Sequence, residues 1–188
     1  MALSVWDDTI AAFGGALAEP QPMPAGVAAA TVTASIGLAL FLKVVAIAAK
    51  RQPIPGLAGA ARRHLLDLEG VVDADAAAYY AYKNASPAER PALAEEAVRI
   101  PLEAARSAVG GVELCAQAAK QVNGLIEADL QAAASILHAS AQAMLACVSA
   151  NLRHMPLTEE ARLGFLAQTR QVAESAAAAF GLIHVDLG

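Results

Sequence analysis

The sequence predicts an all-α protein, an antiparallel bundle of about six helices, several of them long, in a homo-oligomer. Alanine supplies 49 of the 188 residues, whereas aromatic residues supply only 4%. Alanine has the highest helix propensity and a low strand propensity. No segment alternates β-branched or aromatic residues with polar ones as a half-buried strand does. These observations argue against a sheet protein, and therefore against the Rossmann and P-loop classes.

The first two helices are expected on either side of a proline-rich segment. The first should span Val5 to Leu17, with Ser4 as its N-cap. Glu19 to Pro24 contains three prolines, which favour extended chain. The second helix should span Ala25 to Arg51. Because it is apolar nearly all round, we expect it to be the core helix of the bundle.

The remaining helices are long and are joined by short breaks. They are expected at Leu57 to Asn84, Ser86 to Val122, Ile126 to Leu152 and Thr158 to Gly181. Ser86-Pro87-Ala88-Glu89 has the form of a capping box with proline at the first helical position. Pro101 lies inside the following pattern and should kink or break it. Asn123-Gly124 is a stop signal. Long helices with short connections pack as an antiparallel bundle.

Composition narrows the class of protein further. The chain reads as a single domain over residues 1–188, with no repeat and no dividing linker. Its net charge is −5, and no long basic stripe offsets the acids, so a nucleic-acid partner is not expected. Cys115 and Cys147 lack metal-ligand spacing and favour a reducing cytoplasm over a disulfide framework. The N-terminus lacks the positive region of a signal peptide.

One stretch is long enough to cross a bilayer. Gly26 to Ala49 is apolar except for Lys43 and a few hydroxyl residues. Against a membrane span, the stretch is rich in alanine, and a lysine near the centre of such a helix costs about 2.5–3.5 kcal/mol. No second stretch stands out in the sequence. We therefore expect a buried core helix and no membrane partner.

Two pairs of polar residues are candidates for chemistry. Asp73 and Asp75 lie two positions apart on a helix and point about 200° apart. If Asp75 faces solvent, Asp73 tends to face the bundle, although both can equally be ordinary surface acids. Asn123 and Asp129 lie near the start of a long helix. There the alternative is a helix-terminal acid favoured by the dipole.

Other polar residues also leave two interpretations open. A line along the fifth helix is either a solvated face or the wall of a polar cleft; it consists of Gln131, Ser135, His138, Gln142 and Ser149. Lys50 and Arg51 follow the apolar helix. They either complement its C-terminal dipole or bind an anionic ligand tail. No histidines and carboxylates pair at ligand spacing, so no metal site is expected.

Six segments follow one another in a recognisable order. They are Pro20 to Gly26, Lys50-Arg51, Val72-Asp73-Ala74-Asp75-Ala76-Ala77-Ala78-Tyr79, Ile100-Pro101-Leu102-Glu103, Asn123 with Asp129, and Cys147-Val148-Ser149-Ala150-Asn151-Leu152. In this order they resemble the cyclodeaminase/cyclohydrolase family of tetrahydrofolate enzymes, over roughly Val5 to Phe180. A glycine run of that family is replaced here by Met23-Pro24-Ala25, and one asparagine by Cys147.

The resemblance implies a tetrahydrofolate one-carbon enzyme, either a methenyltetrahydrofolate cyclohydrolase or a formiminotetrahydrofolate cyclodeaminase. It also implies a folate derivative as substrate, no tightly bound cofactor, and a homodimer or larger homo-oligomer. The alternative is a catalytically silent relative that binds a small ligand or a protein partner. Under the enzyme hypothesis Asp73 is the first candidate for proton transfer and Asp129 the second. The expected substrate-binding residues are Lys50, Arg51, Asn123 and Asn151.

Overall fold

The structure, a computed structural model, describes residues 5–183, and over this range the chain forms seven α-helices and no β-strand. The helices are α1 (Ile10–Ala18), α2 (Gly26–Ala48), α3 (Leu57–Glu69), α4 (Val71–Asn84), α5 (Arg90–Ala119), α6 (Leu125–His154) and α7 (Glu159–Gly181). The predicted all-α bundle is confirmed.

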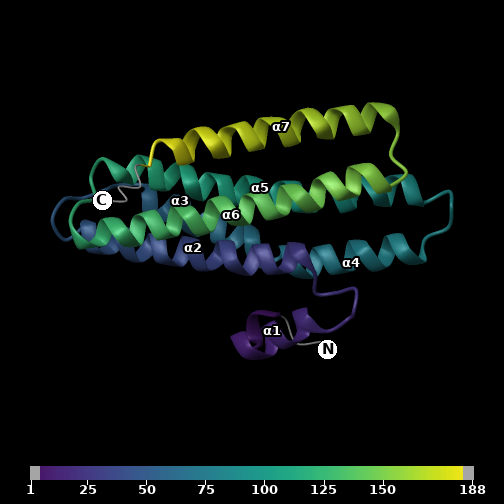
Figure 1. Cartoon of the computed structure of the whole chain (residues 1–188), viewed down its shortest axis with the longest axis horizontal. Helices are drawn as coiled ribbons and strands as arrows, with labels where there is room; N and C mark the ends of the chain where they lie inside the picture. Colours follow the sequence, from purple (N-terminus) through teal and green to yellow (C-terminus); the bar gives the residue numbers. More distant parts are fainter. Residues whose placement is uncertain (1–4, 184–188) are drawn as a thin grey trace.

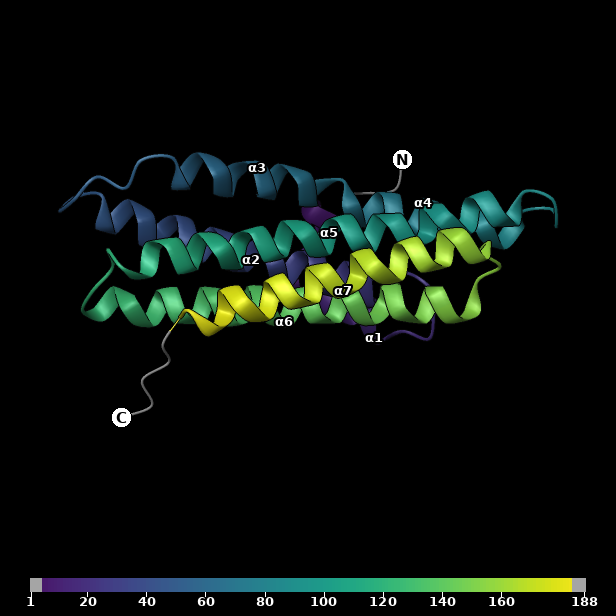
Figure 2. The ribbon, with the colours of Figure 1, turned by 90° about the horizontal axis from the view of Figure 1, so that it is seen from above.

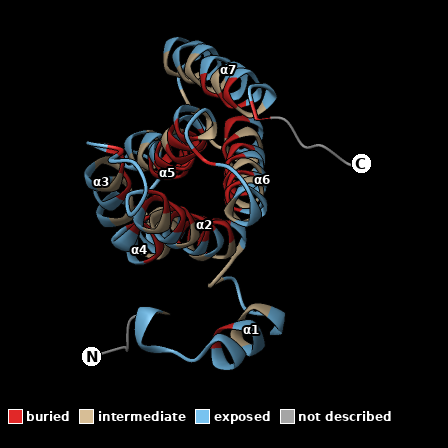
Figure 3. Ribbon diagram, turned by 90° about the vertical axis from the view of Figure 1, so that its left-hand side faces the viewer, coloured by how far each residue is buried: buried red, intermediate tan, exposed pale blue. Residues whose placement is uncertain are grey.

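The centre of the bundle is formed by α2, α5 and α6, and the most extensive packing is that of α6 against the other two (Figure 1). Helix α6 packs along both α2 and α5, and α7 covers α5 and α6. Helices α3 and α4 follow one another along the other side of α5 (Figure 2). Figure 3 shows that the buried faces of α2, α5 and α6 turn toward one another, whereas α1 stands apart from the other helices.

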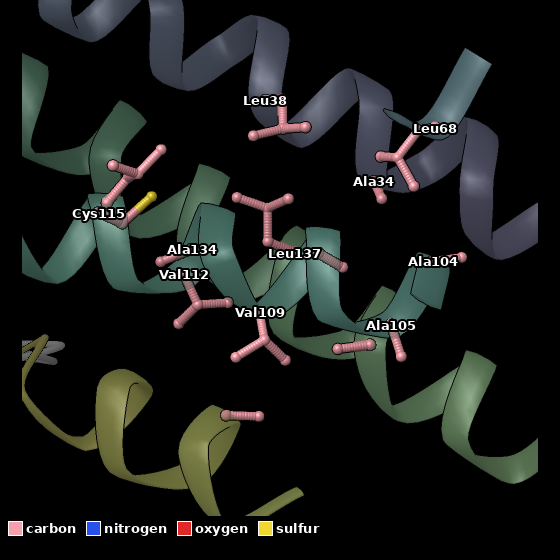
Figure 4. Close-up of a cluster of buried hydrophobic side chains, with 14 of the residues drawn as sticks. Ala34, Leu38, Leu68, Ala104, Ala105, Val109, Val112, Cys115, Ala134 and Leu137 are labelled. Carbon is pink, nitrogen blue, oxygen red and sulfur yellow. The ribbon is translucent and has the colours of Figure 1, made fainter. Parts of the chain in front are cut away.

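The centre of the core depends on two glycines that let helices approach closely. A Cβ atom on Gly37 of α2 or on Gly111 of α5 would come within 2.9 Å of the Leu137 side chain of α6. Leu137 is fully buried and lies among side chains from α2 and α5, including Leu38 (Figure 4). Small residues at these helix crossings thus bring the helices close together, which compensates for the few bulky side chains of this aromatic-poor sequence.

The expected helix boundaries are confirmed in part. The Ser86 backbone N–H donates to Oε2 of Glu89 (3.0 Å), which is one half of the predicted capping box. Residues 87–89 nevertheless form a turn and α5 begins at Arg90, so the predicted helix start at Ser86 is wrong. The Thr158 hydroxyl oxygen accepts from the Ala161 N–H (3.2 Å) and caps α7. Gly124 has φ of 72°, a left-handed conformation that glycine adopts without strain, and it separates α5 from α6.

The start of the chain differs from the prediction. A short 3-10 helix, Val5–Asp7, precedes α1, and Thr9 caps α1 by accepting a hydrogen bond from the Ala12 N–H (3.1 Å). The predicted single helix from Val5 is therefore wrong, because the Thr9 side chain satisfies an N–H at a later start. The expected cap, Ser4, lies outside the described residues.

The predicted third helix is divided at Gly70 into α3 and α4, which raises the number of helices to seven. Glycine costs about 1 kcal/mol relative to alanine inside a helix. At Gly70 nothing packs where a side chain would be. The division lets Leu68 on α3 and Val71 and Val72 on α4 all reach buried positions. The free energy gained by burying apolar side chains on both sides of Gly70 therefore outweighs the cost of interrupting the helix there.

Two helices are long and apolar enough to cross a membrane by length and composition, α2 and α6. The expectation of a single such stretch is therefore wrong. About half of the most apolar window of α2 is buried inside the bundle, and slightly less than half of that of α6. A core helix of a soluble bundle meets the same criterion, so this finding alone does not indicate a membrane protein.

Candidate functional site

The predicted site residues lie at two separate ends of the bundle. At one end, Gly26 opens α2 so close to α6 that a Cβ there would lie 3.1 Å from Sγ of Cys147. At the other end, Nζ of Lys43 lies 2.7 Å from Oδ2 of Asp129. At 1.5 Å per residue, Cys147 and Asp129 are about 27 Å apart along α6. We call these the Asp75 end and the Asp129 end.

At the Asp75 end, the expected orientation of the two acids is reversed. Asp73 is exposed, and Asp75 is half buried. The reason is the register of α4: Val72 and Ala78, three residues before and after Asp75, are both buried. Helical neighbours at these spacings share a face, so Asp75 lies on the core side. The spacing of Val72 and Tyr79 in the sequence already contained this signal. Whether Asp73 carries the chemistry stays a prediction.

Asp75 has the electrostatics of a proton-transfer group. Burial raises the pKa of its carboxyl from the ordinary value of 3.8 to about 6. Desolvation disfavours the charged form of an acid, and among residues 5–183 no cation lowers the pKa of this carboxyl. Cys147 lies near enough that burial and the Asp75 charge together raise the pKa of its thiol. The thiol is therefore a neutral neighbour of the carboxyl near neutral pH.

Asn151 has a structural role that the sequence analysis missed. Pro101 has no N–H, so it leaves the carbonyl of Ala97, four residues earlier, without its helical donor. Nδ2 of Asn151 on α6 donates to that carbonyl (2.8 Å). Helix α5 therefore continues through Pro101, so of the predicted kink or break, the break is wrong. The side-chain Oδ1 of Asn151 takes no part in this bond, so its predicted contact with substrate stays a prediction.

At the Asp129 end, the candidate residues are more exposed. Asp129 is partly exposed and is paired with Lys43. The other three candidates, Asn123, Lys50 and Arg51, are exposed. Lys50 and Arg51 follow α2, about 35 Å along the helix from Gly26. A single chain therefore cannot bring this basic pair to Asp75.

The largest cavity described is also away from Asp75. It has a volume of about 910 Å³ and lies between the C-terminal ends of α5 and α7 and the start of α6. Its polar lining includes Glu113, Lys120 and Glu127, none of which the sequence analysis selected. Gln131, the first residue of the predicted polar line, also lines the cavity, whereas none of the predicted catalytic or substrate-binding residues does. Within residues 5–183, no three His, Cys, Asp or Glu side chains form a group that could hold a metal ion.

Comparison with known proteins shows which family the chain belongs to. The model of the formiminotransferase-cyclodeaminase family matches residues 9–170. The chain belongs to this family. A solved structure of the same class, the formiminotetrahydrofolate cyclodeaminase of Thermotoga maritima, superposes with a TM-score of 0.88 at 20% identity, over 95% of each chain. A search of curated proteins found no match.

Membership of the formiminotransferase-cyclodeaminase family confirms the resemblance drawn from the six segments. The structure adds that four of these segments meet at the Asp75 end. Pro20 to Gly26 leads to the Cys147 contact, Asp75 lies beside Cys147, and Pro101 and Asn151 are joined through Ala97. The other two segments, Lys50-Arg51 and Asn123 with Asp129, lie far along α2 and α6. Four of the six family segments therefore lie at the Asp75 end, and two lie toward the Asp129 end.

Proposed function

We propose that the chain is a tetrahydrofolate one-carbon enzyme, either a methenyltetrahydrofolate cyclohydrolase or a formiminotetrahydrofolate cyclodeaminase. The observation that carries this proposal is a half-buried carboxyl with a pKa near 6 at the point where four family motifs meet. A group with a pKa near the working pH is suited to both accept and return a proton. We therefore assign proton transfer to Asp75, with Asp73 and Asp129 as comparison residues.

In the cyclohydrolase direction, water attacks the amidinium carbon of methenyltetrahydrofolate. The Asp75 carboxylate orients the water and takes its proton as the carbon–oxygen bond forms. The same carboxylate stabilises the cationic substrate. The carbon–nitrogen bond to the departing ring nitrogen then breaks, the proton on Asp75 passes to that nitrogen, and the hydroxyl proton of the tetrahedral intermediate is released to solvent as the carbonyl double bond forms. The product is a formyl group on the other nitrogen, and no metal or bound cofactor is required.

In the cyclodeaminase reaction, the folate N–H nitrogen attacks the carbon of the protonated formimino group and closes the ring, and the Asp75 carboxylate takes the proton that this nitrogen loses. The carboxyl then gives that proton to the amino group, the bond between the carbon and the amino nitrogen breaks, and ammonia leaves the methenyl cation. One acid thus serves either direction. The two activities differ in whether the leaving nitrogen belongs to the folate ring or to ammonia, so the choice between hydrolase and lyase needs a direct assay.

We also propose that the active form is a homodimer. A two-fold axis perpendicular to the bundle makes the helices of the second copy antiparallel to those of the first. The basic end of one copy, with Lys50 and Arg51, then lies toward the Asp75 end of the other. There it can bind the carboxylates of a folate tail. The free cysteines, Cys115 and Cys147, fit the reducing cytoplasm that we expect for such an enzyme.

A specific observation supports the second candidate, a catalytically silent relative that binds a ligand or partner. Glycines in the segment before α2 would allow a close backbone approach, whereas Met23, Pro24 and Ala25 restrict it. In addition, Cys147 stands where the family has asparagine, and it removes a hydrogen-bond donor beside Asp75.

The decay of methenyltetrahydrofolate absorbance tests the proposal. Added protein should accelerate the decay above the rate in buffer, and the Asp75→Asn variant should abolish most of that acceleration. A parallel assay for ammonia released from formiminotetrahydrofolate separates lyase from hydrolase activity. If neither substrate reacts, a thermal-shift titration with folate decides the second candidate, because ligand binding to the native state raises Tm. Absence of both turnover and a shift would overturn the enzyme and any folate-binding role, and would leave a protein partner or another small ligand as the second candidate.

A further inference from the structure

The first turn of α4, which precedes Asp75, packs into a hydrophobic cluster of its own. The buried residues of this cluster are Phe13 of α1, Ala28 of α2 and Val72 of α4. Within residues 5–183 none of the three belongs to the main core of the bundle. Burial of the Val72 side chain therefore depends on α1 and on the first turn of α2.

A second contact of the N-terminal segment, residues 5–18, falls on the other side of the break between α3 and α4. The Trp6 indole N–H donates to the backbone carbonyl of Glu69 (2.7 Å). Glu69 is the last residue of α3, and the last carbonyls of a helix have no donor within that helix. The N-terminal segment therefore contacts the residue just before Gly70 and, through the cluster, the second residue after it.

Both contacts bear on the position of Asp75. Val72 precedes Asp75 by three residues and shares the core side of α4 with it. Ala28 lies in the first turn of α2, and this turn begins where α2 approaches Cys147 of α6. Cys147 is in turn close enough to Asp75 for the carboxylate charge to act on its thiol. Phe13 thus packs against the two helices, α2 and α4, that enclose this carboxyl.

Helix α1 depends on the same contact for its own stability. It has nine residues, and so short a helix is marginal in water without packing. Phe13 is its one buried residue. Gly14 and Gly15 follow directly, and glycine is among the poorest helix formers. Loss of the Phe13 side chain should therefore release α1 and uncover Val72 together.

We propose that Phe13 and Trp6 are positioning residues for Asp75, which hold the first turn of α4 against α2 and thereby keep water from the Asp75 carboxyl. They act through Val72 and Glu69 and touch no reacting atom. The effect on turnover rests on the proton transfer proposed above for Asp75, but the positioning itself does not. Because desolvation favours the neutral form of an acid, loosening α4 from α2 should favour the ionised form of Asp75.

The pKa of Asp75, measured from carboxyl ¹³C chemical shifts of the folded protein, tests this role without an assay of turnover. The wild type should show a pKa of about 6, and Phe13→Ala should lower it to about 5 or less, toward the ordinary value of 3.8. Amide hydrogen exchange in α4 should become faster in the same variant. Phe13→Leu keeps an apolar side chain in contact with Val72 and should restore most of the wild-type pKa. Trp6→Phe removes the indole N–H but keeps a ring, so it should lower the pKa less than Phe13→Ala does.

Phe165→Ala on α7 is the matched control. Phe165 packs against the main core, and α7 lies on the opposite side of the central helices from α1 (Figure 3). This variant should lower Tm but leave the pKa of Asp75 unchanged. The positioning role would be overturned if Phe13→Ala left that pKa at the wild-type value, or if Phe165→Ala lowered it equally. If Phe13→Ala does not fold, Trp6→Phe decides, because an unchanged pKa with unchanged exchange in α4 would overturn the proposal.

Turnover of methenyltetrahydrofolate, measured against pH on the same samples, separates the positioning role from the proposed function. If Asp75 transfers the proton, the apparent pKa of kcat/KM should fall together with that of Asp75 in Phe13→Ala. A fall in the pKa of Asp75 in a protein without turnover would support the positioning role and count against the enzyme. A wild-type pKa of Asp75 at the ordinary value would overturn the positioning role, whatever the turnover.

Discussion

The Asp75 end and the Asp129 end each hold an acid within a family motif, but the two acids have different surroundings. Asp75 is half buried without a cation, and its pKa rises to about 6. Asp129 lies 2.7 Å from the ammonium group of Lys43. An acid that is desolvated without a countercharge can cycle between its protonated and ionised forms near neutral pH. These surroundings are why we propose the Asp75 end for proton transfer.

The largest expected effect comes from removing the Asp75 carboxyl. Asp75→Asn preserves volume but eliminates proton transfer, so turnover should fall about 10²–10⁴-fold. Asp129→Asn and Asp73→Asn should each change turnover by no more than several-fold. Initial rates with methenyltetrahydrofolate compare the three variants directly. If Asp73→Asn gave the large loss and Asp75→Asn the small one, the sequence-based choice of Asp73 would be restored.

The next largest effect concerns Asn151, which holds α5 and α6 together at the Asp75 end. Asn151→Ala should lower the free energy of unfolding by about 1–3 kcal/mol, because it leaves the buried Ala97 carbonyl without a donor. Urea unfolding at fixed pH measures this change.

Pro101→Ala completes a double-mutant cycle for this contact. The substitution returns a backbone N–H to α5 that can bond to the Ala97 carbonyl, so Asn151→Ala should cost less in that background. Additive costs would show that Asn151 does not act through the Ala97 carbonyl, and its predicted role in orienting substrate would then be the better explanation.

Periodicity predicted the bundle because alanine-rich helices and proline or glycine breaks are local properties. It predicted the capping of α7 by Thr158 for the same reason. The pairing of Pro101 with Asn151 is a long-range contact between α5 and α6 that neither residue's neighbours indicate. The burial of Asp75 was accessible from its spacing to Val72 and Tyr79. The separation of Lys50 and Arg51 from Asp75 followed only once the directions of α2 and α6 were known.

A smaller effect is expected in the pH dependence of stability. The folded-state pKa of Asp75 lies above the unfolded value, so between about pH 4 and 6 the folded state binds more protons than the unfolded state. Stability from this group is therefore present below about pH 4 and is lost as pH rises through about 6.

Asp75→Asn removes this loss. The variant should exceed the wild type in free energy of unfolding by about 1 kcal/mol more at neutral pH than at pH 4, a value that allows for solvent screening of a half-buried group. Paired urea titrations at the two pH values measure the difference. A constant difference between the proteins would show that the Asp75 carboxyl is not desolvated in solution.

The smallest effect tests whether the two ends cooperate across a dimer. Lys50 and Arg51 are exposed, so each contributes roughly 0–1 kcal/mol to binding an anionic tail. The double variant Lys50→Ala/Arg51→Ala should therefore weaken folate affinity modestly, mainly at low salt, with little change in turnover at saturation. Within one chain the pair lies too far from Asp75 to act there. An unchanged affinity at low salt in the wild-type background would leave Lys50 and Arg51 as charges that complement the C-terminal dipole of α2.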